Sequence, residues 1–468
     1  MAASQITLDQ TQQLRAELQD HAAVPSPGSE QYERSLKRWS AIGYQRPGVV
    51  VHPTDVQGIA RTVRFAKNHH LDLAVKGGGH STDTSSSSDG GILVDLGSMN
   101  RVRVDPVAQT VAAQGGALWA DVNQVAAQYK LAVVGGTVSQ TGTGGLTLRG
   151  GYGYLTPQYG LVIDNLLSAN TITGEGTVLK ASTKDNADLF WALRGAGPNV
   201  GVVEEFVFQA HPQPNLVWNG MRSYPCSQLS KVIEALNAAL LHPQGKAAAQ
   251  CVLSLSPDNG APIVSTILFF NGSEEEGRRH FSQLLELQCI AEDVKMRPYS
   301  EANTMLDALM PPGGRKKIIG IQLAPPVQPG FASEIMDQIS HKLTNQPDMA
   351  KSSLEIDYFD PSQICRTPIT GTAFPARSNL LNGALILQWT DSTKDEDFIS
   401  WGKSIQSMCE DELRRTGHTS NNTVSNFISY TQDDKATVAD MFGVNADRLS
   451  EIKAEYDPAN IFNKLNPV

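Results

Sequence analysis

Three consecutive glycines precede a histidine in the segment Lys76-Gly77-Gly78-Gly79-His80-Ser81. The segment follows the apolar run 71–75, which reads as a strand, so it is expected at a strand exit. Glycines expose backbone N–H groups without an obstructing Cβ, and Lys76 adds positive charge, a combination that suits a phosphate group. A tight turn is the alternative, and spacing alone does not decide. A lone histidine such as His80 is more often a packed or capping residue.

A second cluster places eight glycines within residues 135–153. Ordering so many glycines costs backbone entropy, so something is expected to approach this main chain closely. No Gly-Lys-Ser/Thr sequence follows, which excludes a P-loop, and Thr147 stands where the dinucleotide fingerprint needs its third glycine. The segment 195–201 also resembles a nucleotide turn, but it follows a helix and precedes a strand, the reverse of the Rossmann context.

The composition bounds the classes of partner. The chain has 468 residues, enough for about three domains. Its 38 basic and 48 acidic residues give a net charge of −10, which argues against nucleic acid and against an anionic membrane surface. No run of 18 apolar residues exists, and the N-terminus has neither a basic start nor an apolar stretch. We therefore expect no membrane span, no secretory signal and a cytoplasmic location.

The five cysteines lie far apart, all of them after residue 225. No CxxC pair occurs and the count is odd, so free thiols are expected rather than a disulfide framework. HExxH and EF-hand patterns are absent, and we expect no metal. A GxSxG elbow is also absent, which removes the simplest serine-hydrolase interpretation.

The elements that would position the glycine clusters form an α+β pattern. Residues 1–44 read as a polar helical leader. Two lobes are expected after it, about 45–115 and 116–210. The first lobe should contain strands at 49–51, 71–75 and 92–96 and a helix that begins near Asp55. The second lobe should contain helices at 118–130 and 186–194, a hairpin around Gly174–Gly176 and a strand at 201–208. Residues 211–424 have fewer glycines, with a strand at 384–389 and a helix at 274–287, and 425–468 form a closing segment.

Four segments, in order, carry a family resemblance: VKGGGHS, GGILVDLGSMN, VGGTVSQTGTGGLTLRGGYGYLTPQYGLVIDN and DLFWALRGAGPNVGVVEEF. They resemble the flavin-binding half of the berberine-bridge-enzyme-like oxidases in the vanillyl-alcohol-oxidase superfamily. The closing YDPANIF is similar to the C-terminal signature of that family, and TAFPARSN is similar to its FPHR turn. The resemblance is dense over about 45–210 and thin over 211–424.

The resemblance implies a two-lobed α+β FAD-binding domain of the vanillyl-alcohol-oxidase type. A substrate domain (211–424) of antiparallel sheet and helices would cover the isoalloxazine, and 425–468 would return to the FAD domain. His80 would be bonded covalently to the flavin 8α-methyl. The implied cofactor-binding residues are Lys76, Gly77, Gly78, Gly79, His80, Ser81, Thr137, Thr141, Gly142, Gly144, Gly145, Gly151, Asn165, Val202 and Val203.

Two departures from the family pattern concern the cofactor. Many relatives carry a second flavin tether, a cysteine in the pattern G-T-C, whereas this chain has Gly136-Thr137-Val138. Valine forms no thioether, so at most one covalent bond, through His80, is expected. Arg149 replaces a glycine before the Gly150-Gly151 pair. Beside a flavin it would stabilise the anionic reduced ring or bind a substrate carboxylate; the alternative is a side chain in solvent.

A third departure concerns the catalytic base. Relatives place a Glu, Gln, Asp or Tyr on the strand after the FPHR turn, but residues 381–389 here contain no ionisable group. Asn382 or Gln388 would orient a substrate without abstracting a proton. Tyr430, in the FISY segment, and Tyr154 remain as candidates. A phenol acts as a base only with a lowered pKa, which Arg149 or Lys76 nearby would favour.

The leading hypothesis is an FAD-dependent oxidase, with Tyr430, Tyr154 and Arg149 as its catalytic residues. A small-molecule substrate, by analogy a natural-product intermediate, would lose a hydride from a C–H next to oxygen or nitrogen, or from an activated ring carbon, to flavin N5; dioxygen would then yield hydrogen peroxide. A monomer or homodimer is expected. The missing carboxylate motivates an alternative, a non-redox isomerase or cyclase on the same scaffold, and a flavin-binding protein without catalysis is a third possibility.

Overall fold

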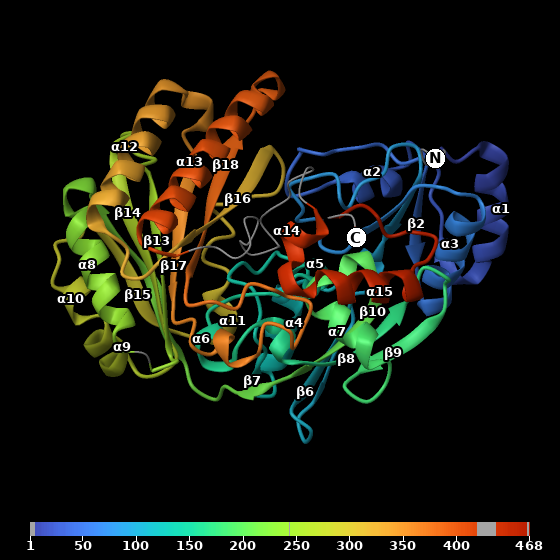
Figure 1. Cartoon of the computed structure of the whole chain (residues 1–468), viewed down its shortest axis with the longest axis horizontal. Helices are drawn as coiled ribbons and strands as arrows, with labels where there is room; N and C mark the ends of the chain where they lie inside the picture. Colours follow the sequence, from blue (N-terminus) through green and yellow to red (C-terminus); the bar gives the residue numbers. More distant parts are fainter. Residues whose placement is uncertain (1–4, 243, 419–436, 466–467) are drawn as a thin grey trace.

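The computed structural model describes residues 5–242, 244–418, 437–465 and 468. It is an α+β fold with two halves side by side (Figure 1). We name them the glycine-rich half, which contains the described residues up to 212 and from 437 onward, and the sheet domain, residues 217–415. Among the described helices, none has both the length and the apolar character of a membrane-spanning segment.

The first lobe of the glycine-rich half contains a four-stranded sheet in the order β1-β2-β4-β3. Strands β2, β4 and β3 are parallel and buried, which explains the continuous apolar run at 49–51. Asp55 begins α3, because its carboxylate accepts from the Gly58 N–H, as expected. The elements are α1 (Leu8–Leu18), β1 (Ala22–Ala23), α2 (Glu30–Leu36), β2 (Val49–Pro53), α3 (Val56–Asn68), β3 (Leu73–Lys76) and β4 (Ile92–Asp95).

The residues predicted as a leader are integrated into this lobe. Strand β1 pairs antiparallel with β2, which makes the N-terminal segment an edge of the sheet. Leu14 and Leu18 of α1 are fully buried in the same core as β2 and β4. The apolar face of α1 is short, and the sequence pattern therefore suggested a polar helix without a packing partner.

The second lobe contains a five-stranded antiparallel sheet in the order β5-β6-β10-β8-β9. The hairpin around Gly174–Gly176 joins β8 and β9, as expected. A small two-stranded sheet of β7 and β11 lies beside it. The elements are β5 (Val102–Asp105), β6 (Thr110–Gln114), α4 (Trp119–Ala127), β7 (Leu131–Ala132), α5 (Thr143–Leu148), α6 (Thr156–Tyr159), β8 (Leu166–Ile172), β9 (Val178–Ser182), α7 (Ala187–Ala196), β10 (Val202–Gln209) and β11 (His211–Pro212).

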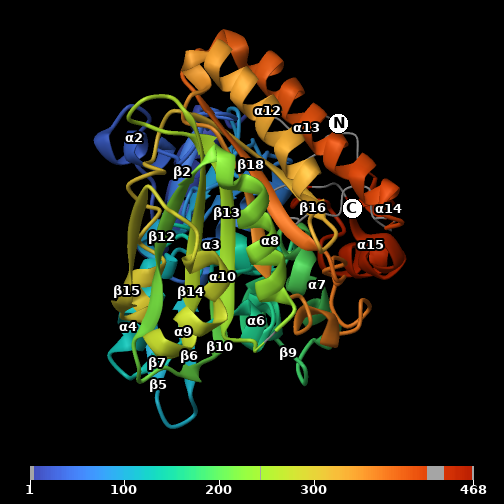
Figure 2. The same ribbon diagram turned by 90° about the vertical axis from the view of Figure 1, so that its left-hand side faces the viewer.

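The sheet domain has seven antiparallel strands in the order β15-β12-β14-β13-β17-β18-β16. Helices α8, α12 and α13 cover its outer face (Figure 2). The elements are β12 (Val217–Pro225), α8 (Leu229–Leu240), β13 (Ala247–Leu255), β14 (Pro262–Phe270), α9 (Glu274–His280), α10 (Ser282–Leu285), β15 (Ala291–Arg297), α11 (Tyr299–Ala302), β16 (Arg315–Leu323), α12 (Pro329–Asn345), β17 (Ser353–Phe359), β18 (Leu381–Trp389) and α13 (Asp395–Arg415).

The single helix predicted over 274–287 is divided into α9 and α10 at Phe281. Phe281 is 3% exposed, and its ring lies 6.1 Å from that of Trp218 in β12. Burial of this aromatic ring against the sheet accompanies the break, a tertiary effect that helical periodicity does not report.

The two faces of this sheet bury different cores, because side chains alternate along each strand. Ala249, Leu268 and Tyr358 pack with the outer helices. The residues that alternate with them, such as Ala248 and Phe269, pack with the core of the glycine-rich half. The inner face of the sheet therefore lies at the junction of the two halves.

The end of the chain packs on the glycine-rich half through α14 (Val438–Phe442) and α15 (Ala446–Tyr456), which contacts α7. The YDPANIF segment turns around Asp457, which accepts hydrogen bonds from the N–H groups of Ile461 and Phe462. Lys453 donates to Asp457 at 2.6 Å and to the Asn199 carbonyl at 2.8 Å. This buried hydrogen-bond network holds the YDPANIF segment in place, a segment that the sequence indicated only through its family resemblance.

Candidate functional site

The two glycine clusters meet through Gly78 and Gly142. A Cβ at Gly78 would lie 2.6 Å from the backbone of Gly142, and a Cβ at Gly142 would lie 2.5 Å from the Gly78 nitrogen. A Cβ at Gly144 would similarly lie 2.9 Å from the Gly115 carbonyl, and one at Gly77 would lie 3.0 Å from the same oxygen. These glycines are therefore required by backbone-to-backbone packing.

The loop that follows β3 presents unpaired backbone donors. Within the part of the chain that the structure describes, the N–H groups of residues 78–81 donate no hydrogen bond to a protein acceptor. Gly79 has a φ of +69°, the left-handed conformation that turns the loop. Successive unpaired N–H groups form a concavity for an anion, which is the property that a dinucleotide pyrophosphate needs.

Lys76 and Ser81 are engaged within the protein. The Lys76 ammonium lies 3.0 Å from the Asp95 carboxylate, and both side chains are largely buried. The Ser81 hydroxyl donates to Asp83 at 2.7 Å. Lys76 was expected to add charge to the anion site, but Asp95 compensates that charge, so the backbone donors carry the anion-binding capacity.

His80 lies between aromatic and cationic neighbours. Its imidazole stacks on Trp39, with ring centroids 4.2 Å apart and planes 16° apart. Its Nε2 atom is buried and has no hydrogen-bond partner among the described residues. Burial, helped by the charge of Lys316, lowers the pKa of His80 to about 4. The imidazole is therefore neutral at pH 7 and keeps a nitrogen lone pair, the state in which histidine acts as a nucleophile.

Among the other glycines assigned to the cofactor, Gly145 has open surroundings and Gly151 has crowded ones. Gly145, in α5, is exposed, and a Cβ there would meet no protein atom within 4 Å. Gly151 has a φ of +76°, and a Cβ there would lie 2.5 Å from Val162. Packing explains Gly151, whereas nothing in the protein requires a glycine at 145.

Thr137 and Thr141 are partly exposed in the loop between the two glycine groups of the second cluster. The Thr141 carbonyl accepts from the Trp119 N–H at 3.0 Å, and its N–H donates to Val138. This backbone bonding fixes the loop and leaves both threonine side chains at its partly exposed surface.

The three remaining positions assigned to the cofactor lie inside the glycine-rich half. Val202 and Val203 are 2% and 3% exposed in β10. Asn165 is buried, its amide donates to the carbonyls of Tyr159 and Leu161, and its oxygen pairs with His211 Nε2 at 2.8 Å. The polar atoms of Asn165 are thus used to hold the turn after the glycine run.

Arg149 is directed inward, which contradicts the alternative of a solvent-exposed side chain. Its Nε atom is buried. Burial lowers the pKa of Arg149 to about 10, opposed by the nearby charge of Asp83. Burial alone would raise the pKa of Asp83, but Arg149 and hydrogen bonds from Ser81 and Ser85 hold it below its ordinary value. Arg149 therefore places a fixed cation beside the loop that carries His80.

The surroundings of Tyr154 are the opposite of those expected for a base. Its hydroxyl donates to the Gln250 side-chain oxygen at 3.3 Å, and its ring stacks on Phe269 at 5.0 Å. Burial raises the pKa of Tyr154, and the nearby acids Glu355 and Asp357 raise it further. Lys76, which was expected to lower this pKa, forms an ion pair with Asp95 instead. The phenol is therefore held protonated.

Glu355 and Asp357 form a carboxyl pair on the inner face of β17. The Gln250 amide donates to both, to Asp357 Oδ1 at 2.9 Å and to Glu355 Oε1. Burial and the charge of its neighbour raise the pKa of Glu355 well above its ordinary value, and burial raises that of Asp357 to about 6. Two adjacent carboxylates do not both ionise readily, so at pH 7 this pair retains one proton.

Strand β18, residues 381–389, contains no ionisable side chain, as the sequence indicated. Asn382 is on the inner face, where its oxygen accepts from Gln322 at 3.4 Å; Gln388 is held by the Lys351 carbonyl. The neighbouring strand β17 supplies the acids. Its sequence, Ser-Leu-Glu-Ile-Asp-Tyr-Phe, alternates acids with apolar residues, a signal of one polar inner face that sequence analysis missed. Tyr430 lies outside the described residues.

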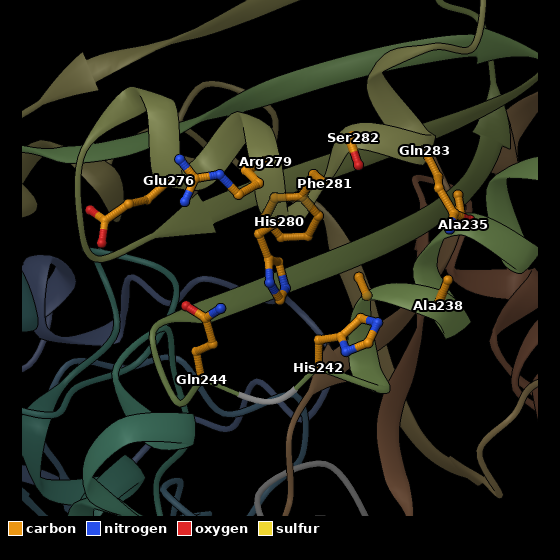
Figure 3. A pocket seen from close by; sticks show the side chains of 11 residues that line it. Ala235, Ala238, His242, Gln244, Glu276, Arg279, His280, Phe281, Ser282 and Gln283 are labelled. Carbon is orange, nitrogen blue, oxygen red and sulfur yellow. The ribbon is translucent and has the colours of Figure 1, made fainter.

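A separate pocket of about 380 Å³ opens among the outer helices of the sheet domain. It is lined by residues of α8, α9 and α10 and by the turn after α8, including His242, Glu276 and His280 (Figure 3). Burial lowers the pKa of His280, and its ring packs on Phe281 at 4.7 Å. The pocket shares no lining residue with the glycine loops or with the carboxyl pair.

Known proteins match both parts of the glycine-rich half. The FAD binding domain family matches residues 47–182, and the family described as berberine and berberine like matches residues 426–468. The FAD-linked oxidoreductase pgmH of Aspergillus terreus is 31% identical over 98% of this chain and 95% of its own length. The chain is an FAD-linked oxidoreductase of the berberine-bridge-enzyme-like family. The recognition, the fold class and the assignment as an FAD enzyme are thereby confirmed.

One further relative and two solved structures are similar to this berberine-bridge-enzyme-like protein. The (R)-6-hydroxynicotine oxidase of Paenarthrobacter nicotinovorans is 28% identical over 93% of this chain and 94% of its own length. A crystal structure of 6-hydroxy-D-nicotine oxidase from Arthrobacter nicotinovorans superposes with a TM-score of 0.80 at 25% identity, over 96% of this chain and 97% of that one. Berberine bridge enzyme itself, at 19% identity and a TM-score of 0.82 over 99% of both chains, shares the fold.

The residues present fit FAD. The row of unpaired N–H groups at 78–81 suits its pyrophosphate, and the unpartnered Nε2 of His80 is a buried polar atom that the protein does not satisfy. Gly145 leaves open a space that a side chain would fill. Contacts within the described residues account for none of these three features.

Proposed function

We propose that this oxidoreductase is an oxidase that removes a hydride from a small molecule at a carbon bearing an O–H or N–H group. The observation that carries the proposal is the carboxyl pair Glu355–Asp357 on the inner face of the sheet domain. Bound FAD supplies the acceptor for the hydride and returns the electrons to dioxygen, which leaves as hydrogen peroxide. The pair supplies the proton acceptor that the reaction also needs.

The carboxyl pair accepts the substrate proton as the adjacent C–H bond breaks. With one proton shared between Glu355 and Asp357, the pair has an open acceptor at neutral pH. Gln250, which donates to both acids, fixes their orientation, and Tyr154 fixes Gln250. Tyr154 is thus proposed as a positioning residue rather than as a base.

An amine is one substrate chemistry that the carboxyl pair suits. An ammonium group would be bound by the anionic pair and would deliver its proton there before oxidation. The name of the bacterial relative, (R)-6-hydroxynicotine oxidase, refers to a compound of this kind and supports the proposal. Arg149, beside the loop that carries His80, is proposed to stabilise negative charge on the reduced cofactor.

His80 is proposed as the single covalent attachment point of FAD. Its imidazole is neutral, and its Nε2 lacks a partner among the described residues. The second tether of many relatives would occupy position 138, where this chain has valine. The remaining cofactor contacts are proposed at the backbone of residues 77–81 and at Thr137, Thr141, Gly142, Gly144 and Gly145.

The non-redox alternative, an isomerase or cyclase, was motivated by a missing carboxylate. Glu355 and Asp357 provide that carboxylate on the neighbouring strand, so no observation now favours the alternative.

The test begins with the visible spectrum of the purified protein and of its acid-precipitated pellet. A yellow pellet in the natural protein and a colourless pellet with yellow supernatant in His80→Ala are expected. The protein is then reduced anaerobically with dithionite and mixed with air-saturated buffer. Rapid return of the oxidised spectrum with one equivalent of hydrogen peroxide supports the oxidase. A reduced flavin that persists in air contradicts it, and a protein that binds no FAD contradicts the cofactor assignment.

A further inference from the structure

The polar groups of Trp39 bond both to the loop of His80 and to the segment 310–316. Its N–H donates to the Gly79 carbonyl at 3.0 Å, directly before the histidine. Its indole Nε1 donates to the Met310 carbonyl at 3.0 Å, and its own carbonyl accepts from the Gly313 N–H at 3.1 Å. Trp39 is 5% exposed. Four independent contacts, counting the ring stack on His80, therefore fix the indole.

The segment that anchors Trp39 belongs to the sheet domain. The Lys316 ammonium donates to the Trp39 carbonyl at 3.1 Å and lies 4.9 Å from the centre of the indole ring. Ser40 adds two hydrogen bonds with the backbone of Lys316, at 2.6 Å and 3.1 Å. Residues 39–40 thus lie between the loop of His80 and the first residues of β16, and we call these two residues the wedge.

The same anchor also reaches the second glycine cluster. The Met310 carbonyl, which accepts from Trp39, also accepts from the Gln140 side chain at 2.7 Å. Ser139 donates to Asp307 at 2.6 Å. The wedge is therefore tied to both loops assigned to the cofactor, and the plane of the indole sets the plane of the imidazole.

We propose that Trp39 is a positioning residue for flavin attachment: its indole holds the His80 imidazole in the orientation from which a ring nitrogen bonds to the flavin 8α-carbon. The proposal rests on the covalent attachment at His80 put forward above. A neutral imidazole has a nitrogen free to react, but a histidine side chain rotates about two bonds unless packing restrains it. Stacking removes that freedom before the cofactor arrives, which is the physical basis of an orientation effect.

The attachment step balances with dioxygen as the oxidant. A carbon–nitrogen bond forms between the 8α-methyl carbon and His80; one methyl C–H bond and the imidazole N–H bond break. Two protons leave to solvent, and two electrons enter the flavin ring. Dioxygen then takes up two electrons and two protons as hydrogen peroxide, which restores the oxidised flavin.

The test measures the covalent fraction, which is the flavin retained in the acid-precipitated pellet divided by total bound flavin, with intact mass as a second readout. Trp39→Leu is expected to bind FAD and to lower the covalent fraction about tenfold or more, because the imidazole is no longer oriented. Trp39→Phe retains a ring over the imidazole and is expected to restore attachment. Trp401→Leu is the matched control, since Trp401 on α13 also packs beneath a lysine, Lys342, in the sheet domain.

Each result bears on the proposal. A covalent fraction in Trp39→Leu equal to that of the natural protein overturns it. Loss of attachment in Trp39→Phe also overturns it, because a stacking ring would still be present. A Trp39→Leu protein that binds no FAD overturns it as well, since Trp39 would then hold the cofactor site rather than orient His80. Covalent flavin that persists in His80→Ala instead refutes the attachment point, whatever Trp39 does.

Discussion

Arg377 and Asp164 form a buried bidentate ion pair that joins the two halves of the molecule. The two Nη–Oδ distances are 2.7 and 3.1 Å, and the side chains are 1% and 12% exposed. Arg377 lies in the TAFPARSN segment, whose Phe374 N–H donates to the Arg194 carbonyl of the glycine-rich half. Both contacts fasten this segment of the sheet domain to the glycine-rich half.

Arg377→Met is expected to lower the free energy of unfolding by about 3–5 kcal/mol, because Asp164 would remain as an uncompensated buried charge. Urea titration with saturating FAD measures the change. Arg448→Met removes an exposed ion pair with Asp188 and is expected to cost at most about 1 kcal/mol. Equal losses in the two variants would show that the Arg377 pair has no special role.

Gly145→Ala separates cofactor binding from packing. The added Cβ meets no protein atom, and alanine favours helix, so the apoprotein is expected to gain up to about 1 kcal/mol of stability. FAD affinity, measured by flavin fluorescence quenching in a His80→Ala background, is expected to fall. Gly330→Ala in α12 has the same open surroundings and should stabilise without weakening FAD. Unchanged affinity in Gly145→Ala would place the cofactor elsewhere.

Asp357→Asn is expected to reduce kcat/KM by about 10²-fold or more, the usual contribution of a general base, because Asp357 is the member of the pair that ionises near pH 6. In the natural protein the activity should rise with pH through about 6, as Asp357 loses its proton. Glu355 keeps its proton and donates a hydrogen bond that lowers the pKa of Asp357, so in Glu355→Leu this rise of activity should shift to higher pH. Initial rates of peroxide release across pH 5–9 measure both effects, with the exposed Glu334→Gln as control. A pH profile that does not move would exclude coupling of the pair.

Asp357→Asn tests the same pair through stability. A carboxyl whose folded pKa is about 6, above its unfolded value of about 3.9, binds more protons when folded, so its contribution falls as pH rises between these values. Because asparagine does not titrate, the variant does not lose this contribution to the free energy of unfolding. Relative to the natural protein, Asp357→Asn should gain about 1.4 kcal/mol per pH unit between pH 4 and 6. Unfolding titrations at pH 4, 5, 6 and 7 measure the difference; a constant difference would contradict the raised pKa.

Tyr154→Phe is expected to reduce kcat/KM by less than about tenfold, because one 3.3 Å hydrogen bond to Gln250 is lost while both acids remain. The shape of the pH profile should stay unchanged. A loss as large as that of Asp357→Asn would restore the phenol as the base.

The sequence predicted the parts of the site that local chemistry determines. Gly79 has a left-handed backbone, and the backbones of Gly78 and Gly142 approach too closely for a Cβ, so both clusters were visible as glycine runs. The strand exit at residue 76 follows from the apolar run before it.

Contacts between distant segments were not predictable in the same way. Asp95 neutralises Lys76, and Trp39 reaches His80 from the segment predicted as a leader. Glu355 and Asp357 acquire their raised pKa only when folding buries them together on the inner face of β17. A single sequence gives residue types and spacing, but these properties arise from burial and from neighbours far along the chain.

The wedge at Trp39 also has a consequence for the order of synthesis. Trp39 is hydrogen-bonded to residues that lie 271 or more positions further along the chain. Asp164 likewise forms its ion pair with a residue 213 positions later, Arg377. A ribosome that has completed the segment matching the FAD binding domain family has therefore produced His80 without the residues that hold it. The contacts that hold the imidazole form only after more than 310 residues have been translated, so the proposed flavin attachment at His80 would follow synthesis of this part of the sheet domain.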